Sequence, residues 1–306
     1  MRSLLPASLV AFTVMAACGP RVDLAREAAG VRWDKLSGRV TYARWDQAES
    51  SDPRGIIFLL DAPARKLSVV RNALTTGKAP SFESTGWVRE VAFKPGASVI
   101  TFTVLSDTLH WEMRTLDLDS KLEQVLFPDS NAHHNFPVWS PNGRLAYNAN
   151  GPDGVHLLVD GQFVLSYPNP SRVAWESSSR VITSLPDATS PGGLYLVDPQ
   201  TQSLTAIVSG TDIFEDPAID AGRRRLAYVR RGPSTGGLAE IWVANIDGTN
   251  QTRATHGYAD YNPAWSADGG AVLFARFHAG LFSYEIASGS ITQVTQMHAD
   301  AMAWSP

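Results

Sequence analysis

Cysteine is almost absent from the chain, since Cys18 is the only one among 306 residues. No disulfide can form within the chain, and a single cysteine close to the N-terminus needs an explanation other than packing. Basic residues are not in excess either. The chain has 26 Lys and Arg but 30 Asp and Glu, and its formal net charge is −4. This balance excludes a protein that attracts nucleic acid through a positive surface.

The apolar run at the N-terminus is short. It covers residues 4–15, which is too few for a comfortable membrane span. Met1 and Arg2 precede the run, and the small residues Ala16 and Ala17 follow it. This order of a basic start, an apolar stretch and small residues is typical of a secretory leader. The protein is therefore expected outside the cytoplasm.

The residues around Cys18 resemble a bacterial lipoprotein signal, in which small residues lead into a cysteine that becomes the acylated first residue of the mature protein. The resemblance implies a signal peptide over residues 1–17, a tether over residues 18–30 and a lipid anchor to the membrane. Gly19 after the cysteine resembles the outer-membrane sorting pattern of a Gram-negative cell. The alternative is an ordinary secretory leader that is cut near Ala17 or Gly19.

A short motif recurs along the whole chain. The clearest copies are HNFPVWSPNGRLAY at residues 134–147 and YNPAWSADGGAVLFAR at residues 261–276. Weaker copies lie at residues 89–103, 171–184 and 215–230, a degenerate copy lies at residues 30–44, and a truncated copy ends the sequence around Trp304. The motif returns about every 45 residues, which is the period of a four-stranded β-propeller blade.

Each copy of the motif predicts a hairpin. Pro137 and Pro263 precede the aromatic residue, and a strand tolerates proline there only if it begins at, or lies on, a sheet edge. The innermost strand of a propeller blade is such an edge. Residues 140–143, Ser-Pro-Asn-Gly, then predict a tight turn into a second strand. We expect aromatic anchors such as Trp139 and Trp265 to pack between neighbouring blades.

A second hairpin follows each copy of the motif. It is seen at residues 155–167, 193–208 and 240–255, where Asp-Gly or Asp-Pro pairs mark the turns. Two hairpins for each repeat amount to one four-stranded antiparallel blade. The sequence therefore predicts an all-β, six-bladed β-propeller over residues 31–306, with seven blades as the alternative if the long first interval hides a second unit.

The truncated last copy of the motif predicts how the ring closes. A terminal strand that pairs into the first blade removes the exposed edge that an open ring would leave. We expect residues 301–304 to form the innermost strand of the blade whose other strands lie near residues 39–44, 56–60 and 67–71. Trp33 would then lie outside this sheet.

The Pro-x-Trp-Ser-Pro-Asn/Asp-Gly pattern, followed by a hairpin like residues 246–253, resembles the WD-type repeats of TolB-like six-bladed propellers. The resemblance covers residues 31–306 and is specific for fold rather than activity. It implies a periplasmic binding module of an envelope complex that presents one propeller face to a protein partner. The protein that names the family also has a small α/β domain before its propeller, and interactions made through that domain are not carried over.

Polar and titratable residues gather in the segments that are expected to join the blades. They are His133, His134, Asn135, Glu215, Asp216, His256, Asp260, Tyr261, His298 and Asp300. Chain direction places these segments around one mouth of the central channel, and we favour their use as a protein-binding rim. A metal or ligand site is the alternative, and solvated loop residues are the simplest explanation. No cofactor or metal is expected, since no closely spaced ligand motif is present.

Three further features are weaker candidates. Residues 232–236 match the nucleophile-elbow pattern G-x-S-x-G around Ser234, but a strand rather than a helix is expected after them, so Ser234 is assigned to a loop. Residues 223–225 form an arginine turn at the opposite mouth, where a solvated turn is expected. Trp87 precedes an innermost strand and is a candidate for the channel mouth.

Two functions are compatible with these patterns. The first is a non-catalytic, monomeric, lipid-anchored envelope protein that binds a protein partner through a propeller face. The second is an enzyme or a small-ligand or metal-binding propeller, similar to propeller lyases or cyclotransferases, that would use His134, His256 and His298 at the channel mouth. The sequence contains no recognisable catalytic set, which favours the first function.

Overall fold

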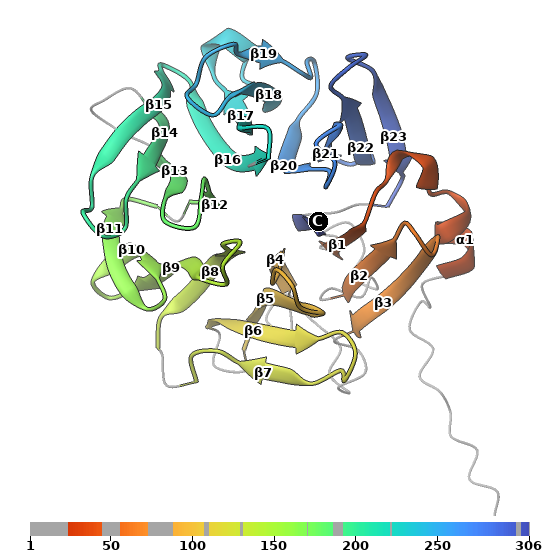
Figure 1. Cartoon of the computed structure of the whole chain (residues 1–306), viewed down its shortest axis with the longest axis horizontal. Coiled ribbons are helices and arrows are strands. Elements are labelled where there is room, and N and C mark those ends of the chain that lie inside the picture. The colour runs from red at the N-terminus through yellow and green to blue at the C-terminus, as the bar shows by residue number, and fades with distance from the viewer. Residues whose placement is uncertain are drawn as a thin grey trace, which may run out of the picture.

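The chain folds as a ring of antiparallel sheets (Figure 1). The structure is a computed structural model that describes residues 24–44, 56–72, 88–106, 110–128, 131–169, 171–185, 192–220, 222–297 and 301–305. These residues form six four-stranded sheets, which are the blades of a β-propeller. The predicted all-β, six-bladed fold is confirmed, and the described strands close the ring without a seventh blade.

The first three blades are numbered in chain order. Blade 1 contains β24 (Ala301–Ser305), β1 (Arg39–Arg44), β2 (Ile56–Asp61) and β3 (Lys66–Asn72). Blade 2 contains β4 (Val88–Phe93), β5 (Val99–Leu105), β6 (Trp111–Asp117) and β7 (Glu123–Val125). Blade 3 contains β8 (His133–Trp139), β9 (Leu145–Gly151), β10 (Gly154–Val159) and β11 (Gln162–Tyr167).

The other three blades follow the same plan. Blade 4 contains β12 (Val173–Trp175), β13 (Val181–Leu185), β14 (Gly192–Val197) and β15 (Leu204–Gly210). Blade 5 contains β16 (Ile213–Asp220), β17 (Arg225–Arg231), β18 (Glu240–Asn245) and β19 (Thr252–Arg253). Blade 6 contains β20 (Asp260–Trp265), β21 (Ala271–Arg276), β22 (Gly280–Glu285) and β23 (Ile291–Thr295).

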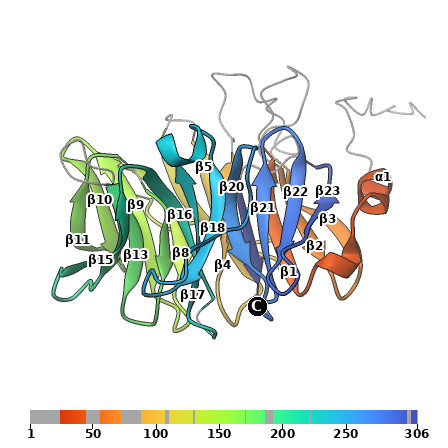
Figure 2. The ribbon, with the colours of Figure 1, turned by 90° about the horizontal axis from the view of Figure 1, so that it is seen from above.

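The propeller has two different faces, which Figure 2 shows edge-on. The innermost strands β24, β4, β8, β12, β16 and β20 run towards one face, where tight turns such as residues 140–143 lead into the second strands. We call this side the turn face. On the other side the chain crosses from blade to blade, and we call that side the interblade face. The short 3-10 helix η3 (Pro233–Thr235) projects from the interblade face (Figure 2).

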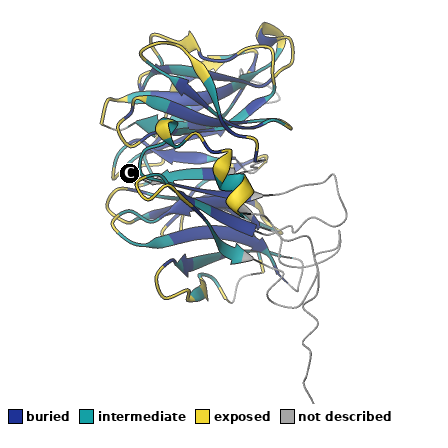
Figure 3. Ribbon diagram, turned by 90° about the vertical axis from the view of Figure 1, so that its right-hand side faces the viewer, coloured by how far each residue is buried: buried dark blue, intermediate teal, exposed yellow. Residues whose placement is uncertain are grey.

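The hydrophobic core lies between the blades. Six clusters of buried side chains each combine residues of two neighbouring blades, such as Tyr42 of blade 1 with Leu273 of blade 6, or Met113 of blade 2 with Tyr147 of blade 3. Both faces of a blade are therefore covered, so a central strand is buried at consecutive positions instead of at alternate ones. β5, for example, is buried at five positions in a row. Exposed residues concentrate at the turns (Figure 3).

The motif tryptophans of blades 3, 4 and 6 each form a hydrogen bond to the preceding blade. The indole Nε1 of Trp139 donates to Thr101 Oγ1 at 2.8 Å, that of Trp175 to the carbonyl of Val138 at 3.0 Å, and that of Trp265 to the carbonyl of Ala218 at 3.1 Å. Each partner lies in the neighbouring blade. A large ring and a satisfied N–H group at the same interface explain why tryptophan recurs at this position. The predicted packing of the anchors between blades is confirmed.

The ring closes as the truncated repeat predicts. β24 pairs antiparallel with β1, with Trp304 opposite Val40 and Met302 opposite Tyr42. The indole N–H of Trp304 also donates to the carbonyl of Ser37. Trp33 lies outside this sheet, in the 3-10 helix η1 (Trp33–Lys35), and packs against the core shared by blades 1 and 6.

The described part of the chain begins with a short helix. α1 (Leu24–Ala29) falls within the expected tether, and its Leu24 and Ala28 pack against the core shared by blades 1 and 6. The predicted leader and Cys18 lie outside the described residues. Within the described ranges, no helix combines the length and apolar character that a membrane crossing requires.

Removing residues 301–306 should destabilise the whole propeller. Blade 1 would lose its innermost strand, the buried side chain of Met302 and the indole contact of Trp304. We expect the free energy of unfolding to fall by at least about 3 kcal/mol, the low end for loss of a large core side chain, as measured by urea titration. Phe163→Ala on β11 is the control, because that ring is 51% exposed. A similar loss in both variants would contradict the closure.

Candidate functional site

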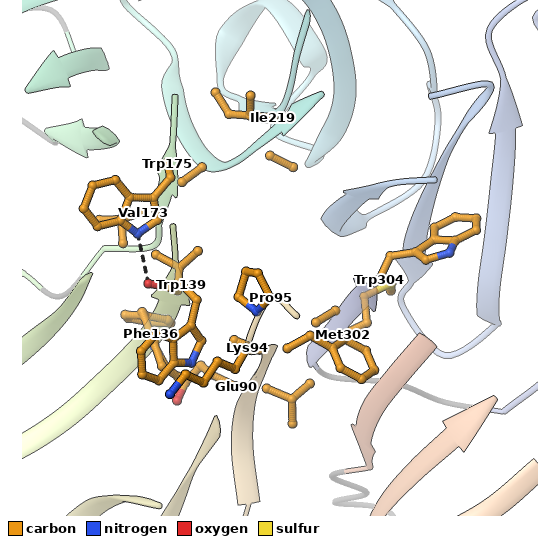
Figure 4. A pocket seen from close by; sticks show the side chains of 18 of the residues that line it. Glu90, Lys94, Pro95, Phe136, Trp139, Val173, Trp175, Ile219, Met302 and Trp304 are labelled. Carbon is orange, nitrogen blue, oxygen red and sulfur yellow. Dashed lines mark hydrogen bonds between the residues drawn. The ribbon is translucent and has the colours of Figure 1, made fainter. Parts of the chain in front are cut away.

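A cavity lies on the axis of the propeller, between the innermost strands of all six blades (Figure 4). Its volume is about 700 Å³. Residues 94–98 and Pro141, which belong to the turns after β4 and β8, are part of its lining. The cavity therefore belongs to the turn face and not to the mouth where the rim was expected. A volume of this size is in the range of sites for small ligands or short peptide segments.

Bulges in the innermost strands shape the deep end of the cavity. Phe136, Asp216 and Asn262 each have a positive φ, of 55°, 51° and 55°, and each precedes a proline. The pairing register of β8, β16 and β20 shifts at these positions. A bulge leaves residues without a ladder partner and redirects their side chains. All three residues line the cavity, so the repeated bulge provides its lining.

Contacts of Arg172 and Asp216 connect four consecutive blades at the deep end. The Nε of Arg172 lies 3.1 Å from Oδ1 of Asp216, and both side chains are mostly buried, with exposed fractions of 24% and 16%. The same guanidinium lies over the ring of Phe136, 5.3 Å from its centroid. The backbone N–H of Asn262 donates to Oδ2 of Asp216 at 3.3 Å. Ion pair, ring contact and backbone bond thus hold the two charges in fixed positions.

Aromatic and apolar groups form most of the remaining wall. Figure 4 shows Trp139, Trp175 and Met302 around the open centre, with Glu90 beneath Lys94. The ammonium group of Lys94 lies 4.8 Å from the ring centroid of Trp139. Glu90 is buried and accepts a hydrogen bond from the hydroxyl of Thr103. An apolar wall with a few fixed polar groups is typical of ligand sites in proteins.

The predicted rim residues of blade 3 lie in a strand rather than in a loop. His133, His134 and Asn135 are the first three residues of β8. The His134 ring is stacked 4.7 Å from Phe127 and lies 5.6 Å from Tyr147. Burial, with a smaller effect of the neighbouring His133, lowers the pKa of His134 to about 4.

His133 and Asn135 also have defined surroundings. Nδ1 of His133 accepts a hydrogen bond from the backbone N–H of Trp111 at 3.2 Å, and its ring meets His110 edge-on at 5.3 Å. Burial, followed by the effect of His110, lowers the pKa of His133. Asn135 is buried. These contacts show how the start of β8 is packed, and the use of these residues as a binding rim stays a prediction.

Among the rim residues that the structure describes, only one, in blade 5, reaches the cavity. Asp216 is that residue, whereas its neighbour Glu215 lies 3.4 Å from Nη2 of Arg231. Burial and, secondly, the charge of Asp216 raise the pKa of Glu215. The adjacent carboxylates therefore have different partners.

In blade 6, Asp260 and Tyr261 begin β20. The carboxylate of Asp260 is fully buried and accepts hydrogen bonds from Nε and Nη2 of Arg276 at 2.8 and 3.0 Å. Tyr261 packs against the core between blades 5 and 6, and His256 is exposed. The other predicted residues, His298, Asp300 and Trp87, lie outside the described residues. Across the ranges that the structure describes, no group of three or more His, Cys, Asp or Glu side chains is placed to hold a metal ion.

Ser234 of the G-x-S-x-G segment has a structural contact. The hydroxyl of Ser234, in η3, donates to the carboxylate of Asp212, which also accepts from Nε of Arg230 at 2.7 Å. The strand β18 follows η3, so the helix that a nucleophile elbow requires does not follow Ser234.

In the arginine turn, Arg225 pairs with Asp220 and lies 4.4 Å from the ring centroid of Trp265. Arg223 and Arg224 face solvent, with side chains 54% and 69% exposed. One arginine of the three therefore supports the anchor between blades 5 and 6, and the other two extend from the turn face.

Sequence reasoning missed most of the cavity residues, although the repeat contains a signal for them. Glu90, Phe136, Arg172, Asp216 and Asn262 each stand three positions before the anchor of their copy. All five line the cavity. This shared position in the repeat indicates all five cavity residues. The titratable residues of the interblade segments indicate only one of them, Asp216.

No family model and no curated protein sequence matches the chain. Among solved structures, TolB from Acinetobacter baumannii superposes with a TM-score of 0.70 at 15% identity, over 89% of this chain and 67% of that one. The chain has the TolB-like propeller fold. A putative TolB from Agrobacterium tumefaciens has a TM-score of 0.66 at 16% identity, over 83% of this chain and 95% of that one.

Other proteins share this TolB-like fold. Hydrazine synthase from Kuenenia stuttgartiensis superposes with a TM-score of 0.65 at 10% identity, over 90% of this chain and 46% of that one. Likeness at such low identity establishes the architecture, while the function must be argued from the site.

The buried His134 should make the propeller acid-sensitive. Its folded-state pKa of about 4 lies below the ordinary value of 6.5, so the neutral ring contributes stability above pH 6.5 that is lost as the pH falls towards 4. We expect His134→Phe to remove up to about 3 kcal/mol of this pH dependence, measured by urea unfolding at pH 7.5 and pH 4.5. His256→Phe, at an exposed position, should leave it unchanged. An unaltered pH dependence in His134→Phe would refute the assignment.

Proposed function

We propose that the chain is an exported, lipid-anchored envelope protein that binds a segment of a partner protein in the cavity at the turn face. The observation that carries this proposal is the cavity itself, about 700 Å³ in volume and enclosed by all six innermost strands. Binding at this site is proposed to be non-catalytic and to need no cofactor, with the chain acting as a monomer.

The chemistry of the wall favours a peptide segment. Aromatic side chains in a desolvated pocket are the usual anchors of protein recognition, and Phe93, Trp139 and Trp175 belong to the lining. The ion pair of Arg172 and Asp216 offers both a donor and an acceptor at the deep end. A peptide carries apolar side chains and alternating N–H and C=O groups, so one short segment can satisfy both parts of the site.

The location rests on the leader and on the resemblance of the repeats. The order of a basic start, an apolar run and small residues before Cys18 supports export and acylation. The TolB-like fold supports an envelope binding module by analogy. The predicted rim at the interblade face stays a second candidate surface, with Asp216 as the residue that it shares with the cavity.

Arg172→Met should weaken partner binding. A photo-reactive amino acid at Pro141, on the cavity wall, would capture the partner in intact cells, and mass spectrometry would identify it. Loss of the charge at the deep end is expected to lower the crosslinked yield at least about tenfold, since removing one member of a buried pair leaves the other unpaired.

Arg144→Met is the matched control for this experiment. Its guanidinium also pairs with a carboxylate, Asp160 at 2.8 Å, and also lies over an aromatic ring, Trp175 at 5.5 Å, but Arg144 is not part of the cavity lining. Equal yields from both variants would argue against the cavity. Capture only from a crosslinker placed at His256 would favour the interblade rim.

A small-ligand site is the second candidate, because the cavity volume also fits a single small molecule. It predicts that the protein purified under native conditions releases a stoichiometric small molecule on denaturation, detected by mass spectrometry. Arg172→Met would then lose this molecule, while crosslinking to protein at Pro141 would be absent from both the parent chain and the variant.

Cys18→Ser should abolish membrane attachment. Without the thiol no thioether to a lipid can form, and we expect the protein to move from the membrane fraction to the soluble periplasmic fraction. Intact-mass measurement of the mature parent chain should show an acylated N-terminus that begins at Cys18. A mature chain with an unmodified N-terminus near Gly19 would support the ordinary secretory leader instead.

A further inference from the structure

Four exposed apolar side chains gather on the interblade face of blades 5 and 6. They are Ile213, Leu238, Tyr258 and Phe277, with exposed fractions of 43%, 39%, 55% and 59%. The other large exposed apolar residues of the described chain are spread along the outer strands of four blades: Leu122, Val125, Phe163, Leu204 and Ile291. Among the described residues, the large exposed apolar side chains of the interblade face are therefore confined to these two neighbouring blades.

The loops that carry this patch are fixed to one another. The backbone N–H of Asp260 donates to the carbonyl of Ala239 at 2.9 Å, which joins the segment of Leu238 to that of Tyr258. The N–H of Phe277 donates to the carbonyl of Ala259 at 2.9 Å. The loops that carry Leu238, Tyr258 and Phe277 are thus joined to one another by backbone hydrogen bonds.

The N-terminal residues of the described chain, including α1, pack beside blade 6. Leu24 and Ala28 of α1 pack against the core between blades 1 and 6, and the backbone N–H of Arg32 donates to the carbonyl of Val294 in β23 at 2.8 Å. Figure 2 shows α1 at the rim of the disc, displaced towards the side from which η3 projects. The chain therefore enters the disc beside blade 6, on the side of the interblade face.

Chain length limits how far this point can lie from a lipid anchor. Cys18 and Leu24 are six residues apart, and even a fully extended chain covers at most about 20 Å over that distance. If Cys18 is acylated, as proposed above, the start of α1 stays within this distance of the bilayer surface. The disc cannot then turn freely above the membrane.

The charged turns argue against contact through the turn face. Every blade has a carboxylate at or just after the end of its third strand: Asp61, Asp117, Asp160, Asp198, Asp247 and Glu285. Basic side chains such as Arg223 and Arg224 extend from the same face. These groups would lose water on approaching lipid, which is costly, whereas exposed tyrosine and phenylalanine side chains are suited to the boundary between headgroups and acyl chains.

We propose that the interblade face of blades 5 and 6 rests on the lipid bilayer, with Tyr258 and Phe277 inserted among the headgroups. The inference rests on the proposed acylation of Cys18 and adds the orientation of the anchored domain. The turn face and its cavity then point away from the membrane, into the compartment where a partner is met. Lipid contact and partner binding use opposite faces of the disc.

Site-specific fluorescence quenching tests this orientation on the full acylated chain in vesicles of phosphatidylethanolamine and phosphatidylglycerol. Acylation converts the only native thiol into a thioether, so Phe277→Cys provides a single free thiol for an environment-sensitive fluorophore. Phe163→Cys is the matched control, because this phenylalanine is similarly exposed but lies on the outer strand of blade 3. Nitroxide groups on the lipid heads should quench the label at position 277 at least about threefold more strongly than at position 163.

The possible results of this experiment test the proposed acylation and the proposed membrane orientation separately. Intact mass is measured first, and an unmodified N-terminus would overturn the proposed anchoring itself. An acylated chain with equal quenching at both positions would contradict the proposed orientation but not the proposed lipid anchor. A label at position 277 that lipid does not quench, but that a membrane protein shields in native membranes, would make the patch a protein interface and would likewise overturn the lipid contact.

Discussion

Packing between neighbouring blades is the interaction on which the rest of the structure depends. Each core cluster is shared by two blades, so no blade buries its apolar surfaces alone. The tryptophan anchors add directional hydrogen bonds across the same interfaces. Stability is therefore a property of the closed ring, and the innermost strands are held at fixed distances around the axis. The cavity exists because these strands cannot collapse inwards without separating the interfaces behind them.

The backbone repeats from blade to blade, but the side chains that line the cavity differ from blade to blade. The position three residues before each anchor faces the axis in blade after blade, yet it holds Glu90, Phe136, Arg172, Asp216 and Asn262 in turn. Packing fixes the anchor, whereas this position is free to vary because it touches the cavity instead of the core. Such a division lets a repeated fold acquire one asymmetric binding site without a change in its architecture.

The repeat made the fold predictable. Proline before an aromatic residue, a Ser-Pro-Asn-Gly turn and a second hairpin are local signals, and their regular spacing is sufficient for blades and for closure by Trp304. The surroundings of the predicted rim residues were harder to predict from the sequence. The sequence places His133, His134 and Asp260 in loops, but a bulge lets Pro137 and Pro263 sit inside the innermost strands, so these strands begin earlier than the prolines suggest. Burial of His134 and the pairing of Asp260 with Arg276 depend on neighbouring strands and could not be predicted from spacing.

The pairing of β24 with β1 has a consequence for the order of events during biogenesis. The first blade receives its innermost strand from β24, which is synthesised after all the other described strands, and Trp304 contacts Ser37 across a separation of 267 residues. Contacts of such long range form late and slowly, because the entropy of closing the loop must be overcome before they contribute. Until β24 pairs with it, β1 keeps an unpaired edge that is open to aberrant pairing with other chains. Late closure of the ring would also suit the proposed export, because a chain that has not yet closed its first blade can still cross a membrane in an unfolded form.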